Sequence, residues 1–216
     1  MIDLHTHSTA SDGTFSPAEL VAEAHKTGLS LFALTDHDTV AGVAEAQRAG
    51  AQYGLRVIPG IEISVTWQPG ELHLLGLGID PENKTLLGLM QYAQEKRQQR
   101  NSKILEKFHE AGIHIDLDQL TALAGGGVIG RPHFAKYLVQ AHKASSIQDA
   151  FQKYLAKGRP FYIEKECLTL AESIEAIKAA HGVPVLAHPM SLYLSWGKLP
   201  ETIAQFKEQG LMGLEA

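Results

Sequence analysis

Short apolar runs recur through the first 80 residues, and helix-start signals lie between them. Residues 31–35, Leu-Phe-Ala-Leu-Thr, form a continuous apolar run, which is typical of a strand covered on both faces. Other runs at residues 1–4, 56–64 and 71–78 predict three further strands. Because strands alternate with helices, this pattern predicts an α/β fold built on a parallel sheet or barrel.

Two capping boxes predict where helices begin. Ser16-Pro17-Ala18-Glu19 also places a proline at the first helical position, and Thr169-Leu170-Ala171-Glu172 repeats the arrangement late in the chain. We expect the two helices to end at Gly28 and Gly182, because glycine commonly follows the last helical residue.

The alternation of strands and helices stops between residues 81 and 160. A long polar helix is predicted over residues 83–111, and Gly130-Arg131-Pro132-His133 opens another helix. We therefore expect a first barrel part at residues 1–80 and a helical insertion over the barrel mouth at 81–160. The barrel continues at 161–216, and the insertion would serve as a lid or substrate subdomain.

After the insertion the α/β pattern returns. Residues 161–164 and 183–187 predict strands, a helix follows near residues 200–209, and residues 210–215 begin another strand. The strand at 183–187 ends directly before His188.

The charge and cysteine content of the chain limit its expected binding partners and its expected cellular location. The chain has 216 residues, a formal net charge of −5 and a pI of about 6.1, so it lacks a general basic field and we expect no duplex DNA partner. The charge run at residues 95–100 is interpreted as a solvated helix face. No apolar run approaches the ~18 residues of a membrane span, so we expect no membrane partner. The single cysteine, Cys167, excludes an internal disulfide and favours a cytoplasmic location, with packing as its role.

Residues of metal-ligating type follow the predicted strands one after another. His5 and His7 are spaced by two, which puts both side chains on one side of an extended chain. In α/β folds the functional site gathers at the C-terminal ends of the strands, where these residues are expected. The complete set is His5, His7, Asp12, His37, Glu62, His73 and His188.

Seven such residues suit a metal cluster. One zinc ion needs about four ligands, so we expect two or three divalent ions, with Glu62 as the bridging carboxylate. Mixed imidazole and carboxylate ligands suit Mn²⁺ best here, with Zn²⁺ or Fe²⁺ as alternatives. Such a cluster lowers the pKa of bound water and holds a phosphoryl group. The alternative is that the residues only hydrogen-bond to one another, but this would bury many titratable groups without a cation.

Five short motifs contain most of these residues. They are His5-Thr6-His7, Ser11-Asp12-Gly13, Thr35-Asp36-His37-Asp38, Pro59-Gly60-Ile61-Glu62-Ile63-Ser64 and Leu186-Ala187-His188-Pro189. Together they resemble the PHP (polymerase and histidinol phosphatase) family of metallophosphoesterases. The resemblance implies a distorted (β/α)₇ barrel with a trinuclear metal centre.

The resemblance also implies roles for single residues. His5, His7 and Glu62 would hold the first metal. Glu62, His73 and His188 would hold the second, and Asp12 and His37 the third. The residues expected to act in catalysis are Asp12, His37, Glu62 and His188. Asp36 and Asp38 would orient the histidine ligands.

Two motifs of the insertion, Gly130-Arg131-Pro132-His133-Phe134-Ala135 and the segment 151–160, resemble one subgroup of this family. That subgroup hydrolyses 3′,5′-nucleotide bisphosphates such as pAp, and its members are also described as 5′-to-3′ exoribonucleases on short RNA and ribosomal RNA 5′ ends. By this resemblance Arg131, His133 and Arg159 hold the substrate phosphates. Guanidinium groups bind phosphate in a bidentate manner, and Arg131 starts a helix, where backbone N–H groups favour anions.

The resemblance therefore implies a metal-dependent phosphoesterase that releases the 3′-phosphate of a small nucleoside 3′,5′-bisphosphate and can also remove the 5′ nucleotide of short RNA. Two alternatives stay open at this point. One is a phosphatase for another small ester such as histidinol phosphate, and the other is a non-catalytic, metal-stabilised interaction module. The sequence carries no prediction of an oligomeric state.

One feature of the family has no counterpart in this sequence. The family ends with a further strand bearing an Asp-x-His motif that completes the first and third metal sites, whereas Glu215 is the one late carboxylate on a predicted strand here. We therefore expect that C-terminal strands of the barrel are missing, about 60 to 70 residues at the usual barrel size.

Overall fold

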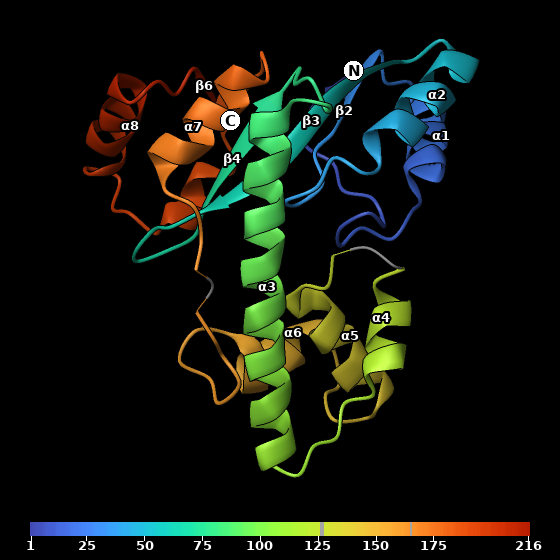
Figure 1. Ribbon diagram of the computed structural model, residues 1–216, viewed down its shortest axis with the longest axis vertical. Helices are drawn as coiled ribbons and strands as arrows, with labels where there is room; N and C mark the ends of the chain where they lie inside the picture. Colours follow the sequence, from blue (N-terminus) through green and yellow to red (C-terminus); the bar gives the residue numbers. More distant parts are fainter. Residues whose placement is uncertain (126–127, 165) are drawn as a thin grey trace.

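The computed structural model has an α/β fold with one curled, open sheet, which forms a half-barrel (Figure 1). The structure describes residues 1–125, 128–164 and 166–216. The strands follow one another in the sheet in the order of the chain. They are β1 (Ile2–Asp3), β2 (Leu31–Leu34), β3 (Arg56–Val65), β4 (Leu72–Leu77), β5 (Val183–Leu186) and β6 (Gly213–Leu214). The α/β class predicted from the sequence is confirmed.

The prediction of a parallel sheet is wrong for β4. Strands β1, β2 and β3 pair in parallel, as do β5 and β6, but β4 is antiparallel to both β3 and β5. The reason is the short connection between β3 and β4, residues 66–71, because a parallel pair needs a crossover of about a dozen residues or more. The start of β4 therefore lies beside the ends of β3 and β5.

Helices cover the sheet on two sides of a long central helix (Figure 1). Helices α1 (Pro17–Lys26) and α2 (Val43–Tyr53) pack with β2 in one apolar cluster. Helices α7 (Leu170–Ala179) and α8 (Leu199–Glu208) pack with β3, β4 and β5 in a second cluster, which also includes the first turns of the central helix. These two clusters hold the strand ends in place.

Both predicted capping boxes are present. The Ser16 hydroxyl accepts from the Glu19 backbone N–H, while the Glu19 carboxylate accepts from the Ser16 N–H at 2.8 Å. Thr169 and Glu172 make the same pair of contacts at the start of α7. Each box pairs backbone N–H groups that the first helical turn leaves without an intrahelical partner.

The central helix α3 (Lys84–Glu110) joins the sheet to a group of shorter helices (Figure 1). Its last turns contribute Ile104 and Phe108 to a third apolar cluster, where the Phe108 ring lies 3.9 Å from the Phe161 ring between centroids. The other elements around this cluster are α4 (Leu117–Leu123), α5 (Arg131–Gln140), α6 (Ile147–Ala150) and the π-helical turn η1 (Phe151–Leu155).

The strand predicted at residues 161–164 is absent from the described part of the chain. Phe161 is buried in the cluster with Phe108 instead, so the segment belongs to the helical group rather than to the sheet. The return to the sheet comes later, where Leu168 makes an isolated parallel bridge with Val65. Among the described residues, every helix is too short or too polar to cross a membrane.

Candidate metal centre

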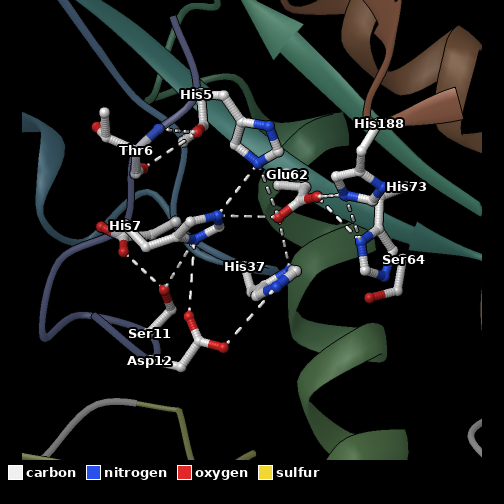
Figure 2. Close-up of polar contacts among 12 residues, drawn as sticks. His5, Thr6, His7, Ser11, Asp12, His37, Glu62, Ser64, His73 and His188 are labelled. Carbon is white, nitrogen blue, oxygen red and sulfur yellow. Dashed lines mark hydrogen bonds and ion pairs between the residues drawn. The ribbon is translucent and has the colours of Figure 1, made fainter. Parts of the chain in front are cut away.

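The first two histidines lie just beyond β1, on a segment that continues alongside β2. Thr6 holds this segment: its N–H donates to Thr35 Oγ1 (3.1 Å), and its hydroxyl donates to the Ala33 carbonyl (2.7 Å). The chain stays extended, so His5 and His7 project to the same side (Figure 2). Their Nε2 atoms are 3.2 Å apart.

A buried carboxylate, Glu62 on β3, lies at the middle of the centre and is 1% exposed (Figure 2). Its Oε2 atom is 3.3 Å from His5 Nε2 and 3.2 Å from His7 Nε2. The same oxygen is 3.0 Å from His37 Nδ1, where His37 follows β2 and forms a parallel bridge with Glu62. Three imidazoles from two segments therefore face one oxygen atom.

The other oxygen of Glu62 faces two more histidines. Oε1 is 3.0 Å from His73 Nδ1 and 3.1 Å from His188 Nε2. His73 lies at the start of β4, opposite Ser64, and the antiparallel direction of β4 brings it to the same face as Glu62. The sequence predicted that His73 lies near a strand end. Because β4 runs antiparallel to β3, its N-terminal end, which contains His73, lies beside the C-terminal end of β3.

His188 has a backbone conformation that residues other than glycine rarely adopt. Its φ is 27°, and that of Asp38 is 53°, both in the left-handed region. The His188 N–H donates to Glu215 Oε2 (2.6 Å), and its ring Nδ1 is 2.9 Å from Ser191 Oγ. These contacts hold the ring towards Glu62, and such unusual backbone conformations cluster at functional sites.

Asp12 lies at the outer edge of the centre, on the loop that follows His7 (Figure 2). Its carboxylate oxygens are 3.7 Å from His7 Nδ1 and 3.9 Å from His37 Nε2. The next residue must be glycine, because a Cβ atom at Gly13 would lie 2.2 Å from the His7 carbonyl oxygen. The tight turn thus directs Asp12 to the two histidines.

Asp36 stabilises the loop that bears Asp12 through hydrogen bonds. Its carboxylate accepts from the Ser8 N–H and the Ser8 hydroxyl, both at 2.7 Å, and from the Ser11 hydroxyl at 2.6 Å. Ser11 Oγ in turn is 3.5 Å from His7 Nδ1. Asp36 was expected to orient a histidine, and the contact runs through Ser11 rather than directly.

Asp38 contacts the central helix. Its carboxylate forms an ion pair with Arg97 and accepts from the Ser64 N–H at 3.2 Å, while its backbone carbonyl accepts from Gln94 Nε2 at 2.8 Å. Asp38 therefore ties α3 to the ends of β2 and β3.

The donor atoms of the centre fit divalent cations. Glu62 Oε2 and His37 Nδ1 are buried and have no hydrogen-bond partner, although each lies close to the other. Buried polar atoms are normally paired, and imidazole nitrogens around a carboxylate are the ligands of Zn²⁺, Mn²⁺ and Fe²⁺ sites. Two groups of three side chains have ligand atoms within 4.8 Å of one another.

These groups are His5, Glu62 and His188, and His7, His37 and Glu62. The partition differs from the one implied by the resemblance, which pairs His5 with His7 and His73 with His188. Glu62 belongs to both groups, as a bridging carboxylate would.

Burial and the close histidines act in opposite directions on the ionisation of the centre. Burial alone would raise the pKa of Glu62, but the electrostatic interaction with His37 and the close ring nitrogens of His188, His5 and His7 hold it well below its usual range. Burial lowers the pKa of His37 to about 4. For His5, burial would lower the pKa, but Glu62 and Glu215 raise it to about 9. Glu62 thus stays ionised, as a metal ligand must.

Glu215, after β6, also reaches the centre. Its Oε2 atom is 3.2 Å from His5 Nδ1, although 210 residues separate the two in sequence. The sequence singled out Glu215 as a late carboxylate on a strand, but no local pattern shows its contact with His5. A cavity of about 460 Å³ opens over the centre, lined by His5, His7, His37, Glu62, Glu71, His73, His188 and Glu215.

The three residues expected to hold phosphate lie in different surroundings. Arg131, at the start of α5, donates to Glu71 Oε1 at 2.7 Å, and Glu71 lines the cavity over the centre. His133 is 1% exposed, and its Nδ1 accepts from the Gly130 N–H at 2.9 Å, so this ring caps α5. Arg159 is exposed in the turn after η1, and its described contacts are backbone hydrogen bonds.

The prediction that residues 95–100 form a solvated face is wrong for two of them. Arg97 and Arg100 are 8% and 4% exposed. They continue the buried stripe of α3, which also contains Leu86, Met90, Ala93, Ile104 and Phe108. The spacing of three and four from Met90 to Ile104 could have revealed this, since it is the period of a buried helix face.

Comparison with known proteins gives consistent relatives. The PHP domain family model matches residues 3–166. The chain is 39% identical over 213 residues to a 5′-3′ exoribonuclease of Haemophilus influenzae, covering 99% of this chain and 77% of that protein. It is 34% identical over 215 residues to a 3′,5′-nucleoside bisphosphate phosphatase of Chromobacterium violaceum, covering 99% of this chain and 75% of that protein.

Solved structures agree. An amidohydrolase from Chromobacterium violaceum with bound sulfate and no metal superposes with a TM-score of 0.91 at 33% identity, covering 99% of this chain and 75% of that one. A candidate metal-dependent phosphoesterase from Bifidobacterium adolescentis superposes with a TM-score of 0.90 at 33% identity, covering 99% of this chain and 76% of that one.

Proposed function

The chain belongs to the PHP domain family, and from this premise we propose that it is a metal-dependent phosphoesterase acting on nucleotides. Its substrate is a nucleoside 3′,5′-bisphosphate, from which it releases the 3′-phosphate and leaves the nucleoside 5′-phosphate. The same centre also removes 5′ nucleotides from short RNA. The names of the relatives, a 5′-3′ exoribonuclease and a 3′,5′-nucleoside bisphosphate phosphatase, support both parts of this proposal.

One observation carries the proposal. Five imidazoles surround the buried Glu62 carboxylate, with ring nitrogens 3.0–3.3 Å from its oxygens. Without a cation such a cluster leaves buried atoms unpaired, as at Glu62 Oε2 and His37 Nδ1. With divalent ions, the same atoms are ligands.

We assign the ions to the residues predicted from the sequence. Glu62 would bridge two ions, held further by His5, His7, His37, His73 and His188, and Asp12 would serve a third position. Mn²⁺ is our choice, because mixed imidazole and carboxylate ligands suit it. When bound, the cluster supplies Lewis-acid stabilisation of the phosphoryl oxygens and lowers the pKa of water.

The chain's own groups then hold and orient the substrate. We propose that Arg131, His133 and Arg159 bind its phosphate groups, and Arg131 is best placed because its partner Glu71 lines the cavity over the centre. Asp36 keeps Asp12 in position through the Ser8–Ser11 turn. Glu215 holds His5 and the His188 backbone from the opposite side.

A second cavity supports the assignment of residues 81–160 as a substrate subdomain. It has a volume of about 730 Å³ and lies between the two parts of the chain. Thr9, Thr39 and Gly42 line it from the sheet side, while Gln94, Asn101 and Leu117 line it from the helical side. Amide groups beside apolar side chains suit a nucleoside, so we place the lid function here.

The test is turnover of adenosine 3′,5′-bisphosphate by metal-stripped protein with added Mn²⁺. We expect phosphate release that depends on Mn²⁺ and is lost in His7→Ala. Equal release by wild type and His7→Ala would reject the proposal. Histidinol phosphate, tested in parallel, separates the nucleotide activity from a phosphatase for other small esters.

Metal binding without turnover of either ester would favour the non-catalytic interaction module. We also propose a cytoplasmic location, which the single cysteine supports, because one cysteine excludes an internal disulfide and so fits a reducing compartment.

A further inference from the structure

The connection between β5 and α8, residues 187–198, begins inside the metal centre. It contains His188, whose ring faces Glu62, and continues through the 3-10 turn η2 (Pro189–Leu192). Leu192 is fully buried in the apolar cluster beneath β3, β4 and β5, and Leu194 packs against the same cluster. One side of this β5–α8 loop is therefore anchored on the core of the sheet.

Hydrogen bonds also fix the β5–α8 loop to residues 66–71, which connect β3 and β4. The Ser191 carbonyl accepts from the Glu71 N–H at 2.8 Å, and the Ser191 hydroxyl donates to the Glu71 carbonyl at 2.9 Å. Trp67 Nε1 donates to the Leu192 carbonyl at 3.2 Å. Because Glu71 lines the cavity over the metal centre, the β5–α8 loop forms part of the rim of that cavity.

Three large side chains on this loop are directed to solvent. Met190, Tyr193 and Trp196 are 59%, 74% and 76% exposed. Single exposed apolar residues are common, but these three fall within seven residues beside the site. Tyr193 lies between the two anchored leucines and has a φ of 51°, which is rare for an aromatic residue. The anchored backbone therefore holds the exposed rings at the rim of the cavity.

Exposed aromatic rings beside this centre suit single-stranded RNA. Unpaired bases stack on aromatic side chains with little dependence on sequence. Removal of a 5′ nucleotide at the centre requires the rest of the RNA strand to continue away from it. Tyr193 is five residues from His188, a distance of at most about 18 Å even along a fully extended chain. A strand whose first nucleotide lies at the centre can therefore reach the ring.

Two lysines lie beside the exposed rings. Lys198 is exposed at the end of the β5–α8 loop. Lys157 is exposed beside residues 66–71, where its Nζ donates to Gln68 Oε1 at 2.5 Å and to the Pro69 carbonyl at 3.4 Å. Both of these acceptors are uncharged, so they do not neutralise the ammonium group. The phosphates of a strand on the loop would thus meet positive charge.

We propose that Met190, Tyr193 and Trp196 form a stacking surface for the RNA bases that follow the nucleotide being removed. This inference rests on the proposed function and extends it to the selection of RNA. Bases would stack on the Tyr193 and Trp196 rings, with Met190 in apolar contact beside them. The surface favours single strands, because the bases of a duplex already stack on one another.

The first measurement is binding of a five-nucleotide RNA with a 5′-phosphate to the Mn²⁺-loaded protein. Phosphorothioate linkages slow its hydrolysis, and a 3′ fluorescent label reports the dissociation constant by anisotropy. The chain has two tryptophans, of which Trp67 is partly buried against the Phe206 ring, 5.3 Å away between centroids. We expect unlabelled RNA to quench the emission of Trp196, and the quenching to disappear in Trp196→Phe.

The variants are Tyr193→Ala and Trp196→Ala, which remove a ring, and Trp196→Phe, which keeps one. Tyr53→Ala is the matched control, because Tyr53 is an exposed tyrosine on α2 that precedes β3 and so lies at the opposite ends of the strands from the centre. Each lost ring should raise the dissociation constant of the RNA roughly five- to a hundredfold, with Trp196→Phe closer to wild type.

The second measurement is kcat/KM for the unmodified five-nucleotide RNA relative to that for adenosine 3′,5′-bisphosphate. We expect this ratio to fall in Tyr193→Ala and Trp196→Ala by a factor similar to the loss of binding, through KM for the RNA. Tyr53→Ala should keep the wild-type ratio. The melting temperatures of all variants should stay near that of wild type, because the substituted side chains are exposed.

Three results would overturn the inference. One is unchanged RNA binding in folded Tyr193→Ala and Trp196→Ala. The second is an equal fall of kcat/KM for both substrates together with a lower melting temperature, which a structural role predicts. The third is a dimer in sedimentation that Trp196→Ala dissociates without a change in RNA binding, which assigns the surface to a second copy. If RNA binds through the rings but neither substrate is turned over, the proposed reaction fails while the stacking surface stands.

Discussion

At the scale of single residues, Asp36 has an important structural role although it is not one of the expected metal ligands. It is 1% exposed and accepts three hydrogen bonds from Ser8 and Ser11, which fix the turn that presents Asp12. Hydrogen bonds to a charged acceptor are stronger than those to a neutral one. The loop that bears Asp12 therefore depends on one buried carboxylate.

Asp36→Asn removes the charge and turns an N–H donor towards other donors. We expect the free energy of unfolding of the metal-free protein to fall by roughly 1–3 kcal/mol, as for other buried groups that lose a charged partner. Urea denaturation at pH 7 measures this. Asp118→Asn, at an exposed position of α4, is the control and should stay within about 0.5 kcal/mol of wild type. A loss of the same size in the control would contradict the role of Asp36.

Single residues also show why the site could be predicted only in part from the sequence. The spacing of His5 and His7 is local, so a strand period placed both correctly on one face. The contact of Glu215 with His5 spans 210 residues and depends on how far the sheet curls. Curling results from the packing of all strands, so no local pattern encodes it.

At the scale of elements, the capping boxes of α1 and α7 have a measurable pH signature. Hydrogen bonds from the Ser16 backbone and side chain lower the pKa of Glu19, and those from the Thr169 side chain and backbone lower the pKa of Glu172. A carboxyl whose folded pKa is depressed contributes stability above its unfolded pKa, and this is lost as pH falls through the folded value.

We therefore expect Glu172→Gln to be less stable than wild type at pH 7, and the difference to shrink as the pH falls below about 4.5. Urea unfolding at a series of pH values between 7 and about 3 tests this. Glu175→Gln, at an exposed site on the same helix, should show no such convergence. A constant difference across the series would remove the carboxylate of Glu172 from the cap.

Elements also differ in how much their own sequence determines. Capping boxes and the bounds of α3 are set by neighbouring residues, and the prediction of a helix over 83–111 matches Lys84–Glu110. The direction of β4 is set by its short connection to β3 and by its partners, and an apolar run reads the same in either direction. Arg97 and Arg100 lie at the helical spacing of the buried face of α3. Their burial was not predicted, because a buried face is identified from its apolar residues and these two are charged.

The C-terminal part of α3 offers a test of whether residues 81–160 form a structural unit. Phe108 is fully buried in the helical cluster, with its ring near those of Phe134 and Phe161. Phe108→Ala should cost about 3–5 kcal/mol, the usual range for a buried aromatic residue. Hydrogen exchange should accelerate first in α4 and α5 while β3 and β4 stay protected. Leu87→Ala, on an exposed part of the same helix, is the control, and equal acceleration in the sheet would contradict a separate unit.

At the scale of the whole molecule, the centre joins segments from both ends of the chain. His5 follows the first strand, Glu62 and His73 come from the middle, and His188 and Glu215 follow the last two strands. Ions bound among them would link every part of the sheet. Metal binding should therefore stabilise the fold as a whole, because a ligand that binds only the folded state shifts the unfolding equilibrium.

Addition of Mn²⁺ at 100 times its dissociation constant should stabilise the protein by about 2.7 kcal/mol per site, or roughly 5–10 °C in melting temperature for a chain of this size. A chelator should reverse the shift. Glu62→Gln keeps the shape of the side chain but removes the shared charge, so its melting temperature should respond to Mn²⁺ far less. Glu175→Gln should respond as wild type does, since its side chain is exposed on α7. A full response in Glu62→Gln would mean that the ions are held without the bridging carboxylate, because a lost bridge must weaken both positions that share it.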